Sequence, residues 1–99
     1  MISRQWHGLA KPGFAEAYVK HLKNETFPAI GKLPGFLRAS ILRRDVSEGV
    51  DFLVVTEWDS VESIRAFAGA NAEEAVVPQN VREMMIEYDH VVRHYEAVE

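Results

Sequence analysis

The residues best suited to acid–base chemistry are three side chains that share one face of a predicted helix. Tyr18, His21 and Glu25 recur at the three- and four-residue spacing of such a face. Because a histidine titrates near neutral pH, His21 could move a proton in the space between this helix and a sheet. The alternative is a half-buried histidine at the edge of the core, with its polar atoms satisfied by hydrogen bonds.

A second histidine directly follows a tryptophan near the start of the chain, in a stretch with the pattern of a strand. Neighbouring side chains of a strand point to opposite faces, so Trp6 and His7 cannot serve the same surface. We favour Trp6 toward the helices and His7 toward the open face, although a shift of one residue would exchange them. His7 is therefore the second candidate for a catalytic base, or else a surface or interface histidine.

Bulky aromatic side chains on the predicted strands could wall a binding site. Trp58 lies on a strand that should neighbour the strand of Trp6, so the two indoles could face one cavity. Phe52 lies on the same strand as Trp58 and is a further candidate. The alternative for all three rings is ordinary packing in the core or at a dimer interface.

Arg4 has two interpretations. The first and last strands should pair antiparallel, which brings Arg4 near residues 95–96. If it is exposed there, it forms an ion pair with Glu96 worth under about 1 kcal/mol. If it lies in a pocket, it donates hydrogen bonds to a phenolate or carboxylate, and His94 would help to orient the substrate's oxygens.

Metal, phosphate and dinucleotide sites have no matching pattern in the sequence. His90 and His94 have a spacing that suits a metal on a helix, but on a strand they would be about 13 Å apart. Cysteine is absent, which excludes disulfides, thiolate ligands and cysteine nucleophiles. No phosphate loop, nucleophile elbow or dinucleotide-binding glycine pattern occurs. We therefore expect no cofactor and no metal.

The composition is that of one globular domain covering residues 1–99, since 47% of the residues are hydrophobic. The net charge is −4, from 11 Lys+Arg and 15 Asp+Glu, and no basic cluster is present. Nucleic acid and anionic membranes are therefore not expected as partners. No apolar run has the length of a signal peptide or a membrane span, which predicts a cytoplasmic protein.

Periodicity and turn signals predict strands at 2–9, 36–46, 50–59 and 88–98. They predict a first helix at 12–29 and a second helix that starts at Asp59 or Ser60. The second helix is interrupted at 68–71, and a further helical stretch follows at 72–86. The order β-α-β-β-α-β is that of the ferredoxin-like split motif of the α+β class, a four-stranded antiparallel sheet of order 4-1-3-2 with both helices on one face. The other face carries Leu, Val and Ile, so we expect a second copy to cover it.

Several motifs add a family resemblance. These are "WHG" near the start, "LRR" in the second strand, "EWDS" before a helix, "RAFAG…AVVP", and the terminal "HYEAV". With them the chain resembles the antibiotic biosynthesis monooxygenase (ABM) family of the dimeric α/β-barrel superfamily. The resemblance implies a homodimer in which two sheets close into a barrel, and a pocket in each protomer between sheet and helices. Some relatives oxygenate polycyclic phenols or quinol-like molecules without a cofactor.

Other relatives in this superfamily degrade haem, and the resemblance speaks against that activity here. They use an Asn on the first strand, a Trp on the second helix and a haem-ligating His shortly after it. In this chain His7 lies near the Asn position, Phe67 stands at the Trp position, and the His position falls in "EEAVVP". No axial ligand stands in place.

The first functional hypothesis is thus a small homodimeric ABM-type monooxygenase that acts on an aromatic or quinol-like molecule. His21 or His7 would move protons, and Arg4 and His94 would orient the substrate's oxygens. The pocket would be shaped by Trp6, Tyr18, Phe52, Trp58 and Phe67. The alternatives are a non-catalytic protein that binds a small hydrophobic molecule, and a dimerisation module. A closed cavity with aromatic walls and a buried histidine would favour the enzyme.

Overall fold

The computed structural model describes residues 1–98. It contains a five-stranded antiparallel sheet of order β2-β3-β1-β4, with β5 pairing with the other end of β1. The strands are β1 (Ile2–Ala10), β2 (Phe36–Val46), β3 (Gly49–Trp58), β4 (Met85–Tyr88) and β5 (Arg93–Glu96). The helices are α1 (Ala15–His21), the π-helical turn η1 (Leu22–Thr26), α2 (Phe27–Ile30), α3 (Val61–Ala68) and α4 (Gln79–Met84). The predicted ferredoxin-like α+β fold and strand order are confirmed.

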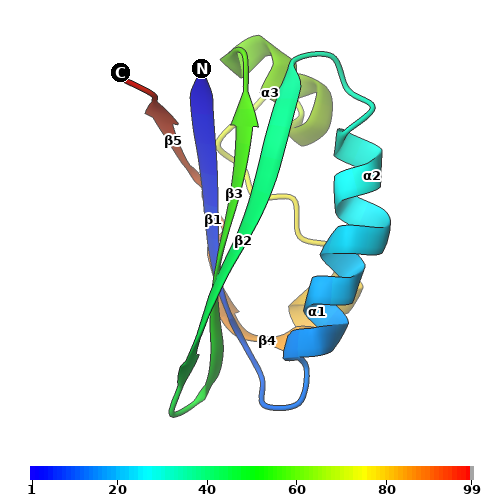
Figure 1. The fold of residues 1–99 in the computed structure, drawn as a ribbon, viewed down its shortest axis with the longest axis vertical. Coiled ribbons are helices and arrows are strands. Elements are labelled where there is room, and N and C mark those ends of the chain that lie inside the picture. The colour runs from blue at the N-terminus through cyan, green and yellow to red at the C-terminus, as the bar shows by residue number, and fades with distance from the viewer. Residues whose placement is uncertain (99) are drawn as a thin grey trace.

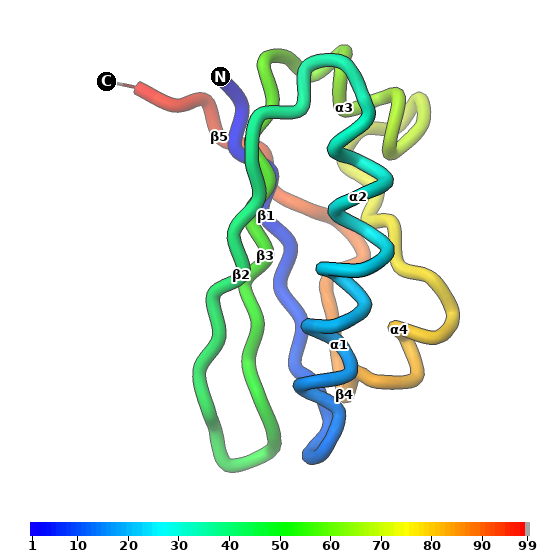
Figure 2. The backbone as a smooth tube through the Cα atoms, turned by 45° about the vertical axis from the view of Figure 1, so that its right-hand side comes forward, coloured from blue at the N-terminus to red at the C-terminus, as the bar shows by residue number. Residues whose placement is uncertain are grey.

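The helices lie on one face of the sheet (Figure 1). The continuous helical stretch α1–η1–α2 runs along the sheet, with α3 near one end and α4 near the other (Figure 2). Alternation in β3 places Phe52, Val54, Thr56 and Trp58 on the helix side, where all four are buried. None of the helices within residues 1–98 has the length and apolar character needed to cross a lipid bilayer.

The first helical stretch differs from the predicted helix at 12–29 in its start and in its geometry. Gly13 has a φ of 86°, outside the helical region, so α1 begins only at Ala15. Further along, the N–H of Phe27 donates to the carbonyl of Leu22, five residues back, instead of four. Pro28 comes next and has no N–H to donate to the preceding turn. The disturbance expected at Pro28 therefore takes the form of a π-turn just before it.

The sequence predicts that the second helix starts at Asp59 or Ser60, and the structure shows which of the two caps α3. Ser60 is the N-cap, and its hydroxyl accepts a hydrogen bond from the N–H of Ser63 at 3.3 Å. Asp59 is therefore not the cap, and the carboxylate of Glu62 does not turn back to it as in a capping box but pairs with Arg65. The helix ends at Ala68, before Gly69 with its φ of 88°.

The predicted helix at 72–86 is wrong over its first half. Only α4 (Gln79–Met84) is helical, and Pro78 precedes it in an extended conformation. We call residues 72–78 the strap. The strap lies antiparallel to residues 90–92. The N–H of Ala75 donates to the carbonyl of His90 at 3.0 Å, and the N–H of Val92 donates to the carbonyl of Glu73 at 2.8 Å.

The predicted closing strand at 88–98 is replaced by two strands: β4 begins at Met85, inside the predicted helix, and β5 begins at Arg93. Asp89 still donates its N–H to the carbonyl of His7 at 2.9 Å, whereas residues 90–92 leave the sheet to pair with the strap. The last strand pairs in a register that places Arg4 opposite His94 and Ile2 opposite Glu96. The interpretation of Arg4 as the partner of Glu96 is therefore wrong. At the other sheet edge, Ser47 and Glu48 form the turn of the hairpin, and β3 begins at Gly49, one residue earlier than predicted.

The open face of the sheet carries both apolar and charged side chains. Leu42 of β2 lies opposite Leu53 of β3, and Leu42 is 53% exposed. Ion pairs border them on this face, Arg44 with Asp51 at 2.9 Å and Arg38 with Glu57.

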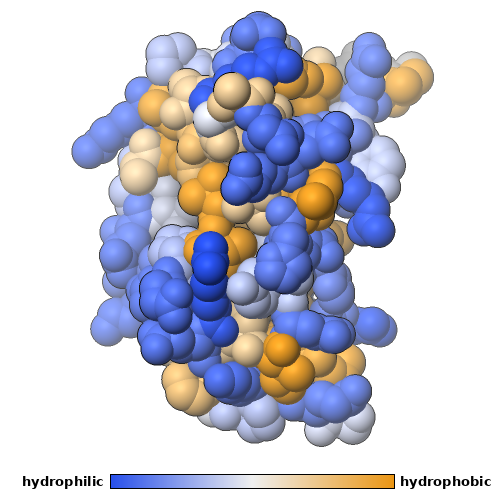
Figure 3. All heavy atoms as spheres, turned by 180° about the vertical axis from the view of Figure 1, so that it is seen from behind, coloured by the Kyte–Doolittle hydropathy of each residue, from blue (hydrophilic) through white to orange (hydrophobic). Residues whose placement is uncertain are grey.

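On the face opposite to the view of Figure 1, apolar side chains reach the surface in separate patches between hydrophilic ones (Figure 3).

Candidate functional site

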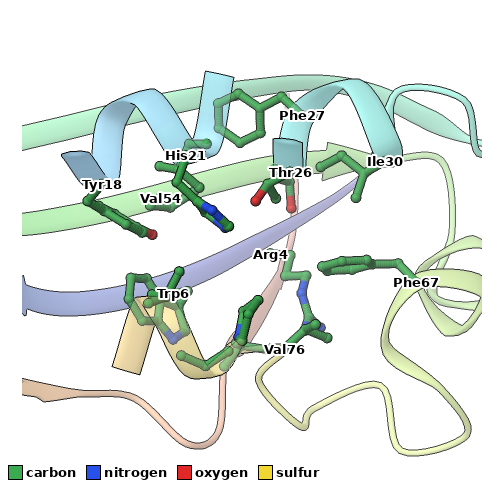
Figure 4. Close-up of a pocket in the computed structure, with 16 residues that line it drawn as sticks. Arg4, Trp6, Tyr18, His21, Thr26, Phe27, Ile30, Val54, Phe67 and Val76 are labelled. Atoms are coloured by element: carbon green, nitrogen blue, oxygen red, sulfur yellow. The ribbon is translucent and has the colours of Figure 1, made fainter. Parts of the chain in front are cut away.

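A cavity of about 70 Å³ lies between the sheet and α1–η1–α2 (Figure 4). Most of its lining is apolar, with a few polar side chains among them, as is common in small-molecule sites. The lining comes from β1, β3, all three segments of the first helical stretch, α3, the strap and the chain after it: Arg4, Trp6, Tyr18, His21, Leu22, Thr26, Phe27, Ile30, Val54, Thr56, Phe67, Val76, Val77, Pro78, Val81 and Val92.

The cavity continues into a wider depression of about 430 Å³ that is more open to solvent. The two share six lining residues, which mark the passage between them: His21, Thr26, Ile30, Phe67, Val76 and Pro78. Ligand pockets span roughly 300–1,000 Å³, so the inner cavity alone is small for an aromatic ligand of several rings. The inner cavity and the depression together offer such a ligand enough room.

His21 lies at this passage on the last turn of α1 and is 8% exposed. Its imidazole points into the cavity (Figure 4). The Nδ1 atom lies 3.3 Å from Oε2 of Glu25, one helical turn further on, and 3.5 Å from the side-chain nitrogen of Asn80. The Glu25 carboxylate favours a proton on Nδ1, and the Asn80 amide accepts from the same N–H when its oxygen rather than its nitrogen is turned toward the ring. Nε2 then keeps the lone pair that accepts a proton.

Tyr18 lies one turn before His21 on the same helix face, and its hydroxyl also points into the cavity (Figure 4). The side chain is 3% exposed. Burial raises the pKa of Tyr18 well above its usual value, because the interior disfavours a phenolate. The phenol is therefore neutral at physiological pH and can donate a hydrogen bond to a ligand oxygen.

Trp6 extends from β1 beneath Tyr18, and the two ring centroids are 5.8 Å apart. Its indole N–H donates to the carbonyl of Asp89 at 3.0 Å, which fixes the ring against the segment between β4 and β5. Gly8, the next residue on the same face, leaves room for the indole, since a Cβ there would lie 2.7 Å from Cζ3 of Trp6.

Arg4 also lines the cavity from β1 and is 4% exposed. Its guanidinium donates to the carbonyls of Ala72 and, at 3.0 Å, of Glu74 in the strap. It lies 5.5 Å from the ring centre of Phe67, a cation–π arrangement. Burial lowers the pKa of Arg4 to about 10, which still leaves it charged at neutral pH.

His94 lies behind Arg4 on the neighbouring strand. Its Nε2 is 2.9 Å from Nη1 of Arg4, and because a guanidinium can only donate, Nε2 must be the acceptor. His94 is therefore neutral, with its proton on Nδ1. Its pKa is lowered, first because it is partly buried and second because Arg4 is positively charged.

The sequence profile of antibiotic biosynthesis monooxygenases matches residues 4–79, a range that runs from Arg4 through the strap. The chain belongs to this family. The resemblance that the sequence motifs indicated is thus confirmed.

Solved structures share the fold of this ABM protein. A Bacillus cereus protein with a provisional assignment as an antibiotic biosynthesis monooxygenase is 22% identical, with a TM-score of 0.66 over 100% of this chain and 94% of the other. SnoaB, a cofactor-independent oxygenase from Streptomyces nogalater, is 14% identical, with a TM-score of 0.63 over 99% and 93%. MhuD, a haem degrader from Mycobacterium tuberculosis with two haems bound, is 23% identical, with a TM-score of 0.63 over 98% and 96%. A comparison with curated proteins finds no significant match.

The structure brings five of the nine predicted site residues of this ABM protein together in the cavity lining: Arg4, Trp6, Tyr18, His21 and Phe67. His94 is not part of the lining, and its Nε2 contacts the lining residue Arg4. Trp58 and Phe52 are fully buried and are not part of the lining. Trp58 stacks on Phe67 with ring centroids 6.1 Å apart, and Phe52 packs edge-on against Tyr18 with centroids 5.0 Å apart. Each thus packs against one ring of the lining and supports it from outside the cavity.

His7 lies on the open face of the sheet, as favoured from the sequence, so it is outside the cavity. Its side chain is 47% exposed, and its Nε2 lies 2.5 Å from Oδ1 of Asp51. Sequence reasoning missed Thr26 and Thr56, which belong to the lining, and the hydroxyl of Thr56 accepts the indole N–H of Trp58 at 2.9 Å. Alternation in β3 could have indicated Thr56, while Thr26 depends on the π-turn. Within residues 1–98 no group of three or more His, Cys, Asp or Glu side chains is arranged to hold a metal ion.

Proposed function

We propose that this ABM-family protein is a monooxygenase that oxidises a hydroxy-aromatic, quinol-like molecule with dioxygen, with His21 as the base. One observation carries the proposal: a buried imidazole, oriented by Glu25, faces an apolar cavity that has a neutral phenol beside it. A proton acceptor and an oxygen-directed donor are the groups that the ionisation of a phenolic substrate requires.

The first step is removal of the substrate's hydroxyl proton by Nε2 of His21. The imidazolium that forms is stabilised by the carboxylate of Glu25 at Nδ1, 3.3 Å away. Tyr18 donates a hydrogen bond to the substrate oxygen as negative charge develops on it. The surroundings from Val54, Val76 and Phe27 are apolar, and their low dielectric strengthens both interactions.

The ionised substrate is itself the reductant of dioxygen in the second step. One electron passes from the anion to dioxygen, and the two radicals combine to form a carbon–oxygen bond and a peroxide. Cleavage of the O–O bond with loss of the hydrogen on the same carbon gives a carbonyl and hydroxide, which takes the proton from His21. The ring loses two hydrogens and gains one oxygen atom, and the other oxygen atom leaves as water, so no external reductant is needed.

Oxygen uptake with 9-anthrone and a panel of quinols tests this proposal. We expect uptake with at least one substrate, and a decrease of about 10²–10⁴-fold in kcat for His21→Gln, the usual contribution of a general base. His7→Gln is the matched control, since it removes an imidazole on the open face and should stay within about twofold of wild type.

Two outcomes would contradict it. If His21→Gln and wild type have equal rates, the assignment of the base is wrong. If wild type binds the aromatic compounds, measured by quenching of tryptophan fluorescence, but consumes no oxygen with any of them, the protein is a binding protein of the same fold.

Haem degradation, the activity named for MhuD, has less support in this chain. The segment where the resemblance places a haem-ligating histidine contributes Val76, Val77 and Pro78 to the cavity. These side chains cannot coordinate iron.

We further propose that the protein works as a homodimer joined through the open face of the sheet. Leu42 is exposed on this face opposite Leu53, and the ion pairs of Arg44 and Arg38 lie around them. An apolar centre with a charged border is typical of an interface between two copies.

A further inference from the structure

Arg4 is a buried cation that has no acidic partner among residues 1–98. Within residues 1–98 no carboxylate oxygen lies within 4.0 Å of its guanidinium nitrogens. Other arginines that the structure describes, among them Arg38, Arg43 and Arg44, do have a carboxylate partner within that distance. Its neighbours are two carbonyls, the neutral His94 and the ring of Phe67. Because a buried charge is normally paired, a cavity that contains one invites a ligand of opposite charge.

The guanidinium also retains donors for such a ligand. It has five N–H groups. Two on Nη1 are engaged by Ala72 and His94, and one on Nη2 is engaged by Glu74. The Nε–H and the second N–H of Nη2 have no partner among the described residues. These donors belong to adjacent nitrogens of a rigid fork, the geometry that a carboxylate accepts in a bidentate manner.

The guanidinium of Arg4 and the proposed reacting centre at His21 and Tyr18 lie in different parts of the cavity. Arg4 reaches the cavity from β1 beside Phe67, whereas His21 and Tyr18 reach it from α1 (Figure 4). Apolar side chains, among them Val54 and Val76, line the space that a ligand ring would occupy. A ligand that satisfies both ends needs an ionisable hydroxyl toward His21 and an anionic group toward Arg4.

We infer that the substrate is an aromatic hydroxy acid whose carboxylate binds to Arg4 while its hydroxyl faces His21. This inference rests on the proposed function for the role of His21, and it narrows the substrate class from quinol-like molecules in general to those with a carboxylate on the ring system. Arg4 is then the residue that determines specificity.

Binding of three naphthalene probes tests the inference: 6-hydroxy-2-naphthoate, its methyl ester and 2-naphthol. Affinities are measured by isothermal titration calorimetry at pH 7.5, where the carboxylate is ionised. Wild type should bind the carboxylate at least about tenfold more tightly than the ester. The preference should persist at 0.5 M NaCl, because salt screens a buried ion pair much less than an exposed one.

Arg4→Met removes the charge and keeps much of the side-chain volume, so the carboxylate should lose its advantage while the affinity for 2-naphthol stays within about threefold. Arg93→Met is the matched control, since it removes a positive charge from an exposed position of the same sheet and should leave the preference intact. If Arg4→Met does not fold, as judged by circular dichroism, the wild-type comparison still decides, since equal affinity for carboxylate and ester overturns the inference.

The result is separable from that of the proposed function, because binding of these probes requires no oxygen. Equal affinities together with oxygen uptake that depends on His21 would overturn the carboxylate inference alone. A carboxylate preference that depends on Arg4, without oxygen uptake on any substrate, would overturn the monooxygenase and leave a binding site for aromatic acids.

Discussion

At the scale of single residues, Gly8 shows how one missing side chain can position a wall of the cavity. Side-chain alternation predicts that Trp6 and His7 face opposite sides, but alternation is symmetric and does not say which side is which. The space above Gly8 accommodates the indole on the helix side, where a Cβ would lie 2.7 Å from Cζ3 of Trp6 and 3.2 Å from Sδ of Met85. The sequence motif "WHG" thus has a packing reason that its letters alone do not reveal.

Gly8→Ala should therefore displace Trp6 and lower the free energy of unfolding by about 1–3 kcal/mol, the usual cost of overpacking a core. Urea unfolding followed by tryptophan fluorescence measures this loss. Ser3→Ala, on the open face of the same strand, is the control and should change stability by less than about 0.5 kcal/mol. A Gly8→Ala variant as stable as wild type would show that the indole moves aside freely.

At the scale of elements, the strap is the part of the fold that local sequence could not predict. Residues 72–78 contain good helix formers, which explains the predicted helix. Their backbone groups instead bond to residues 90–92 and to Arg4, which is 68 residues away in the chain from Ala72. Pairing at such sequence separation leaves no local pattern, and only Pro78 indicated that a helix would be interrupted. The π-turn is missed for a similar reason, since apolar spacing does not distinguish it from α-helix.

The hydrogen bond between Arg4, which also holds the strap, and His94 predicts that the stability of the fold depends on pH. The pKa of His94 is lowered in the folded protein, by burial and by Arg4, so the unfolded chain takes up a proton at a higher pH than the folded one. Stability from this group is complete above the unfolded pKa of about 6.5 and decreases as the pH falls below it toward the folded pKa.

Wild type should thus lose more free energy of unfolding between pH 7.5 and pH 5 than His94→Asn, in which the group that titrates is absent. Chemical denaturation at the two pH values measures the difference. The carboxylates are the same in both proteins, so their contribution to the pH dependence of the free energy of unfolding cancels in the comparison. Equal losses in both proteins would mean that His94 does not couple to folding.

At the scale of the whole molecule, topology was the most predictable property. The order of elements and the right-handed crossover determine a sheet of order β2-β3-β1-β4 with helices on one face, whatever the details of each helix. The cavity was less predictable, because its lining comes from segments distant in sequence, and five of nine proposed residues reach it. The open face follows from the topology, and its Leu42 and Leu53 remain exposed or half-exposed in a single copy.

If a second copy covers this face, a negative charge at its apolar centre should separate the two. We expect wild type to be a dimer in sedimentation velocity at tens of micromolar, and Leu42→Asp to sediment as a monomer, because the interface would bury an unpaired carboxylate. Val91→Asp, which changes an apolar side chain that is 61% exposed beside the strap, should remain a dimer. A wild-type monomer over this range would remove the dimer from the proposed function, while the cavity, which is formed within one chain, would keep its role.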